Sequence, residues 1–194
     1  MKATPLSDLA EFDPANEVEK ITEKIRDILR RHLKRRGLVV AMSGGIDSSV
    51  SAALCVRALG RQKVFGLLLP EKDSSAKSES RGELLARHLG IDYLTVNIAE
   101  TLDSIGCYQW RDDAIKDVFP EYKSQSWKNK ITIQGGLDGQ INHFTLVVQS
   151  PDGQIYEKSL KLKQYLQIVA ATNFKQRIRK TIEYFHADRL NYAV

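Results

Sequence analysis

The sequence contains few cysteines, no long apolar run and no strong excess of either charge. Two cysteines among 194 residues cannot build a disulfide framework, and this is typical of proteins from reducing compartments. No apolar run approaches the length of a membrane span, and residues 1–16 are polar and hold no signal-peptide core. We therefore expect a cytoplasmic protein that does not associate with membranes.

The charge balance argues against nucleic-acid binding. Lys and Arg number 29 against 24 Asp and Glu, which gives a net charge of +5. Much of the basic excess lies between residues 30 and 36, at the end of a predicted helix, where cations offset the helix dipole and stay solvated. Because no aromatic residues are interleaved with this run, we expect no nucleic-acid partner. The four histidines show no metal-ligand spacing.

Apolar runs and helical periodicities alternate over the first hundred residues. Strands are predicted at 38–42, 64–69 and 93–98, and helices at 17–36, 47–59 and 81–89. We expect Asn16 and Glu19 to form a capping box at the first helix and Gly37 to end it. The polar residues 71–80 are predicted to be a loop. This order indicates an α/β class with a parallel sheet, in which ligands bind outside the carboxyl ends of the strands.

The pattern changes after residue 101. A broken helix is predicted at 103–118, and residues 124–163 alternate as a small antiparallel β insert, with turns at Gly135-Gly136 and at 151–153. A helix follows at 163–191. Residues 192–194 then read as the start of another strand, so we expect the chain to be truncated at its C-terminus.

Residues 43–48, Ser-Gly-Gly-Ile-Asp-Ser, lie between a buried strand and a helix and are the most informative segment. Glycines let backbone N–H groups turn inward, and the following helix start adds a positive dipole, so the segment predicts an anion cradle. Asp47 would oppose a bare anion and suits a cation that accompanies phosphate, such as Mg²⁺. The segment lacks the P-loop lysine and the third glycine of dinucleotide loops. An ordinary capped glycine turn is the less favoured alternative.

This segment resembles the SGGxDS loop of enzymes that split ATP into AMP and pyrophosphate. Two further stretches resemble NAD synthases in particular. One is Leu67-Leu68-Leu69-Pro70 with Ser74-Ser75 and the helix leading to Leu89-Gly90-Ile91, and the other is Asn173–Arg179, NFKQRIR. The resemblance implies an adenine-nucleotide alpha-hydrolase-like, Rossmann-like fold. It also implies one incomplete ATP pyrophosphatase domain over 17–194, after an N-terminal tail at 1–16.

The resemblance also implies a reaction and a set of binding residues. NAD synthases adenylate deamido-NAD with ATP, and ammonia then attacks the acyl-adenylate to give NAD. By this resemblance Asp47 would bind Mg²⁺ and Arg177 would contact deamido-NAD, although Arg177 and Arg179 also fit a solvated helix face. Lys72 and Arg81 are less specific and receive no role, and no residue is assigned a catalytic role. The ATP-binding residues would be Ala41, Met42, Ser43, Gly44, Gly45, Ile46, Asp47 and Ser48.

The family's next motif, a strand ending in Gly-Thr with a nearby Mg²⁺-binding Glu, does not occur before Val194. The resemblance therefore implies that this chain alone is inactive or nearly so. No nitrilase-like glutaminase sequence precedes the loop, so ammonia is the expected nitrogen donor, with a separate glutaminase left open as its source. A homodimer is expected, since family members are usually dimers.

Two other functions compete with this interpretation. A sulfurtransferase of the same superfamily would need a reactive cysteine, and Cys107 is the candidate predicted to lie outside the core, although it has no CxxC partner. A non-catalytic nucleotide-binding or dimerisation module would bind ATP without turnover. Sulfur transfer that depends on Cys107, or ATP binding without products, would identify these alternatives.

Overall fold

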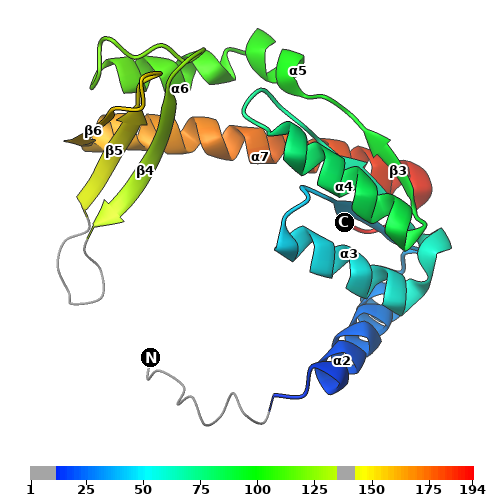
Figure 1. Cartoon of the computed structure of the whole chain (residues 1–194). Helices are drawn as coiled ribbons and strands as arrows, with labels where there is room; N and C mark the ends of the chain where they lie inside the picture. The colour runs from blue at the N-terminus through cyan, green and yellow to red at the C-terminus, as the bar shows by residue number, and fades with distance from the viewer. Residues whose placement is uncertain (1–11, 135–142) are drawn as a thin grey trace. The chain divides into compact units, whose positions relative to one another are not determined.

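The computed structural model of the chain describes residues 12–134 and 143–194 (Figure 1). Two compact units are formed, one from the described residues up to Ile98 together with Arg179–Val194, and the other from Ala99–Ile178. None of the described helices is both long and apolar enough to cross a bilayer.

The elements are, in chain order, α2 (Pro14–Asp27), the π-helical η1 (Ile28–Leu33), β1 (Leu38–Ala41), α3 (Ile46–Leu59), the 3₁₀ turn η2 (Arg61–Lys63), β2 (Val64–Leu68), α4 (Ala76–Leu89), β3 (Asp92–Thr95), α5 (Ala99–Ser104), α6 (Cys107–Lys116), β4 (Lys128–Gln134), β5 (His143–Gln149), β6 (Ile155–Ser159) and α7 (Leu162–Leu190).

The first unit is built on a parallel sheet with the order β1-β2-β3. The chain's last residues extend it, because Ala193 forms a parallel bridge with Leu38 and accepts a 2.8 Å hydrogen bond from the Val39 N–H. The α/β class with a parallel sheet and the strand-like pairing of the C-terminal residues, both predicted from the sequence, are therefore confirmed.

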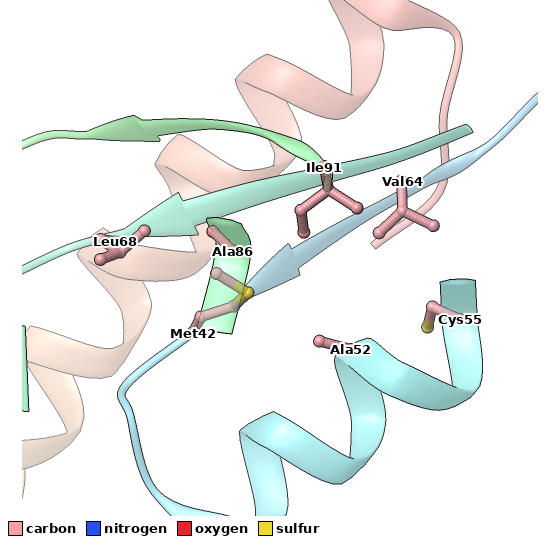
Figure 2. Close-up of a cluster of buried hydrophobic side chains, with 7 residues drawn as sticks. All are labelled: Met42, Ala52, Cys55, Val64, Leu68, Ala86 and Ile91. Carbon is pink, nitrogen blue, oxygen red and sulfur yellow. The ribbon is translucent and has the colours of Figure 1, made fainter. Parts of the chain in front are cut away.

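Helices cover both faces of this sheet, because side chains alternate along each strand. Figure 2 shows one face, where α3 and α4 bury a cluster against β1 and β2. On the other face, the His186 ring of α7 stacks on Phe65 of β2 at 5.7 Å. The strand order reverses direction at β1, between β2 and the 192–194 segment. In doubly wound sheets such a reversal opens a crevice at the carboxyl end of the strand, and the glycine-rich segment follows β1 there. The cluster in Figure 2 consists of Met42, Ala52, Cys55, Val64, Leu68, Ala86 and Ile91.

The first helix begins earlier than the sequence predicts. Its N-cap is Asp13, whose carboxylate accepts hydrogen bonds from the N–H groups of Ala15 at 3.0 Å and Asn16 at 3.2 Å, with Pro14 at the first helical position. The predicted capping box of Asn16 and Glu19 is therefore wrong. Glu19 instead forms an ion pair with Arg57 of α3. Both Asp13 and Asn16 are good caps, and the favourable first-turn proline selects the earlier one.

The end of this helical segment also differs from the prediction. The π-helical η1 stops at Leu33, and Lys34 takes the left-handed conformation with φ 51° that was expected of a glycine. Gly37 is needed for space instead, because a Cβ there would lie 2.4 Å from the Lys63 carbonyl oxygen.

Helix α4 begins inside the segment predicted as a loop. Ser75 is its N-cap, and the Ser75 hydroxyl accepts a 3.1 Å hydrogen bond from the Ser78 N–H. The predicted loop at 71–80 is therefore wrong from Ala76 onward, since a serine-rich stretch marks a helix start as readily as a loop. The end at Gly90, with φ 65°, agrees with the prediction.

The second unit contains α5, α6, an antiparallel sheet β4-β5-β6 and the first part of α7. Leu146 and Val148 of β5 pack with Ile115, Phe119 and Ile168 in one buried cluster. The small antiparallel sheet, the break between α5 and α6 and the turn at 151–153 were all predicted and are confirmed. The predicted turn at Gly135-Gly136 lies outside the described residues, and the insert limits at 124–163 stay a prediction.

The glycine-rich segment packs tightly on α4. Gly44 has φ +73°, and a Cβ at this position would lie 2.4 Å from the Ser78 carbonyl oxygen and 2.9 Å from the Arg81 Cβ. Both the backbone conformation and the lack of space therefore require glycine. This contact fixes the path of the segment after β1.

We predict that Gly44→Ala destabilises the first unit by more than the ~1–2 kcal/mol of left-handed strain, because the new methyl group meets a backbone oxygen. Gly90→Ala is the matched control, since Gly90 has φ +65° and meets only the flexible Arg61 side chain at 3.4 Å. Urea unfolding followed by circular dichroism measures both variants. Equal losses in the two variants would contradict the close contact at Gly44.

The pH dependence of stability is predicted to involve His186. Burial lowers the pKa of His186, and the nearby Arg189 lowers it further. The Arg189 Nε–H donates to His186 Nδ1 at 2.9 Å, which requires an unprotonated ring nitrogen. The unfolded chain takes up a proton near pH 6.5 while the folded state resists it, so this contribution to stability is present above about pH 6.5 and is lost as the pH falls.

His186→Gln should therefore reduce the drop in unfolding free energy between pH 7.5 and 5.5, since a glutamine oxygen can still accept from Arg189 without titrating. Urea titrations at the two pH values measure the difference. His88→Gln, which changes an exposed histidine of α4, is the control and should follow the wild type. Parallel curves for His186→Gln and the wild type would show that His186 does not carry this pH dependence.

Candidate nucleotide site

The predicted site begins where the sheet pairing ends. Ala41 is the last residue of β1, and the Met42 N–H continues the pairing by donating to the Leu67 carbonyl oxygen at 2.8 Å. The Met42 side chain is 3% exposed and lies in the core beside α3 (Figure 2). These two residues therefore anchor the segment, and they can offer a ligand little more than backbone atoms.

Serine hydroxyls hold the glycine turn in shape. The Ser43 N–H donates to Ser48 Oγ at 3.2 Å, and the Gly45 N–H donates to Ser43 Oγ at 3.3 Å. The hydroxyls of Ser48 and Ser49 both donate to the Gly45 carbonyl oxygen, at 3.0 and 2.8 Å. The serines thus act first on their own backbone, and Ser49 shares this role.

The start of α3 leaves backbone donors open. Its N-cap, Gly45, is extended and supplies no side-chain cap. The N–H groups of Ile46, Asp47 and Ser48 find no acceptor in the part of the chain that the structure describes. Such first-turn N–H groups point along the helix axis toward the positive end of the dipole. The geometry of an anion-binding helix start, which the sequence predicts, is present.

Asp47 presents an exposed carboxylate at this helix start. Among residues 12–134 and 143–194, no group of three or more His, Cys, Asp or Glu side chains is placed to hold a metal ion. Mg²⁺ commonly binds through one or two carboxylates together with phosphate oxygens and water. The lone Asp47 therefore fits a magnesium ion that arrives with a nucleotide, and it does not fit a metal held by protein ligands alone.

Two arginines of the first unit lie near the carboxyl edge of its sheet. Arg179 of α7 donates from Nε to the Leu69 carbonyl oxygen, just after β2, at 3.4 Å. A solvated helix face was the alternative interpretation of Arg179, but the residue is half-buried and its side chain is bonded to the sheet edge. Arg81 lies against Gly44, as described above. Arg177 belongs to the other unit, and its contact with deamido-NAD stays a prediction.

Both cysteines are buried, although the sequence predicted this only for Cys55. Cys55 lies on the buried face of α3, where burial raises the pKa of its thiol. Cys107 is fully buried, and its S–H donates to the Ala171 carbonyl oxygen at 3.4 Å. The expectation that Cys107 lies outside the core was wrong, because Cys107 begins α6 and lies against the backbone of α7. A thiol in this position is a poor nucleophile for sulfur transfer.

Comparison with known proteins agrees with this geometry. Residues 17–124 match the family model described as NAD synthase. The chain is 47% identical over 189 residues to the NH(3)-dependent NAD(+) synthetase of Rhizobium rhizogenes, covering 97% of this chain and 57% of that protein. It is 48% identical over 189 residues to the enzyme of the same name from Rhizobium meliloti, covering 97% and 56%. The chain thus spans little more than half the length of these curated relatives.

Solved structures share the fold at low sequence identity. An NH3-dependent NAD synthetase from Campylobacter jejuni has a TM-score of 0.57 at 22% identity, covering 93% of this chain and 55% of that one. An NMN synthetase from Francisella tularensis has a TM-score of 0.56 at 18% identity, covering 94% and 53%. These two likenesses confirm the predicted Rossmann-like α/β fold, and they leave the substrate open because one fold serves more than one reaction.

The family model covers more than half of the chain, and it includes the loop, the open start of α3 and the turn of α4 that packs on Gly44. On this match and this geometry, the chain belongs to the NAD synthase family.

Proposed function

We propose that the protein carrying this sequence is an ammonia-dependent NAD synthase, which amidates deamido-NAD to NAD while ATP is split into AMP and pyrophosphate. The observation that carries the proposal is the open start of α3. Its three free N–H groups belong to the last three residues of the SGGxDS segment, which lies at the carboxyl end of β1 and at the switch point of the sheet. The relatives whose names state this reaction match nearly all of the chain.

The chemistry explains why the site needs these groups. A carboxylate is a poor electrophile, so the nicotinate oxygen must first become part of a good leaving group, which is AMP. Attack at the α-phosphate expels pyrophosphate, and charge builds on the departing oxygens. The N–H groups of Ile46, Asp47 and Ser48 are fixed donors for that charge, and they need no rearrangement during the step.

Asp47 would hold Mg²⁺ beside the same phosphates. When bound, the metal ion supplies charge neutralisation for the leaving pyrophosphate. The hydroxyls of Ser43 and Ser48 keep the turn open by bonding to its backbone. We propose that Arg177 binds deamido-NAD through its bidentate fork, that ammonia is the nitrogen donor, and that the protein is a cytoplasmic homodimer.

We predict that this chain binds Mg-ATP and that Asp47→Ala weakens the binding at least about tenfold, since the metal loses its carboxylate. Isothermal titration calorimetry measures the affinity. Asp92→Ala is the matched control. Asp92 is also exposed, but it is the first residue of β3 and so lies at the amino ends of the strands, away from the loop at their carboxyl ends. Equal affinities for the wild type and Asp47→Ala would remove Asp47 from the site.

We predict that NAD synthesis requires the sequence to continue to the length of the Rhizobium relatives. Such a protein should form NAD, AMP and pyrophosphate in equal amounts from deamido-NAD, ATP and ammonium. The present chain alone should form little or none, because it spans only 57% of the length of the Rhizobium rhizogenes relative. Chromatography of the nucleotides measures the products. Splitting of ATP without NAD formation by the longer protein would contradict the proposed reaction.

A further inference from the structure

We propose that Arg81, which neither the sequence motif nor the family resemblance singles out, binds the β- and γ-phosphates of the nucleotide. This inference rests on the proposed function, because it assumes that ATP occupies the loop after β1. It adds a cation from a separate helix to a loop that carries none of its own.

The position of Arg81 is fixed by backbone packing. The Arg81 Cβ lies 2.9 Å from the place where a Gly44 Cβ would stand, and the Gly82 N–H nitrogen lies 3.2 Å from the same point. Gly82 is buried, and a Cβ on it would lie 2.9 Å from Leu68 Cδ2, so this turn of α4 is pressed between β2 and the loop. Arg81 itself is exposed at the rim of the loop.

The side chain of Arg81 is uncommitted. Other arginines of this unit are engaged: Arg57 with Glu19, Arg87 with Glu83 and Tyr93, and Arg179 with the Leu69 carbonyl. Within residues 12–134 and 143–194, the Arg81 guanidinium makes no hydrogen bond, ion pair or ring contact. An arginine that is free to move beside open N–H donors can close onto an anion without breaking an existing interaction.

The charge of the loop supports the same assignment. Residues 43–48 contain one ionisable side chain, and it is the acidic Asp47. P-loops meet the charge of their phosphates with a lysine inside the loop, and that lysine is missing here. Arginine is suited to the task because its planar fork donates two parallel hydrogen bonds to phosphate oxygens. Contact with the terminal phosphates would hold the leaving pyrophosphate in line.

The test compares phosphate ligands rather than ATP alone. Calorimetry measures the affinity of the wild type, Arg81→Ala and Arg81→Lys for Mg-ATP, Mg-pyrophosphate and AMP. We expect Arg81→Ala to lose at least about tenfold for ATP and for pyrophosphate and less than about threefold for AMP, with Arg81→Lys between wild type and Arg81→Ala. Arg87→Ala, the same change later in the same helix, should bind each ligand as the wild type does.

The other outcomes separate the two proposals. Arg81→Ala binding within about twofold of the wild type for ATP and pyrophosphate, while Asp47→Ala is impaired, overturns the role of Arg81 and leaves the proposed function intact. A wild type that binds neither ATP nor pyrophosphate overturns both. An equal loss for AMP and ATP in Arg81→Lys, which keeps the charge, also overturns the contact, because AMP carries neither of the terminal phosphates.

Discussion

The candidate nucleotide site depends on the contact between the backbone of Gly44 and the first two turns of α4. Glycine is required on both sides of the contact, since Gly44 approaches the Ser78 carbonyl and Gly82 lets the helix approach β2. The Ser75 cap starts α4 early enough to place those turns beside the loop. The conformation of the loop is therefore determined by a helix from the next crossover, and the open donors at α3 follow from it.

The sequence predicted most of the elements because their signals are local. The buried runs of β1 and β2, the glycine after α3 and the long α7 are each contained in one stretch of chain. The predictions failed where two neighbouring residues could both start or end the same helix. Asp13 and Asn16 both suit a helix cap, and the better one was decided by Pro14 and by the use of Glu19 in an ion pair with α3. Such a pair joins distant segments, and no local pattern reveals it.

The residues of the candidate site also fall into those that local sequence predicts and those that it does not. The loop at 43–48 and the Asp47 carboxylate could be found from the sequence, because the turn, the helix start and the predicted metal ligand occur in one motif. Arg81, Arg179 and the burial of Cys107 could not, since each depends on which helix packs on which strand or helix. The fold is also shared with an NMN synthetase, and a shared fold alone does not determine the substrate.

Each compact unit contains one of the two cysteines, and both thiols are buried. A thiol reacts with an alkylating reagent only after local opening brings it into contact with solvent. The modification rate of Cys55 therefore reports the opening of the unit that holds the sheet, and that of Cys107 the opening of the other. Peptide mass spectrometry distinguishes the two sites. The rates of local unfolding of the two units can therefore be measured separately in one experiment on the unaltered chain.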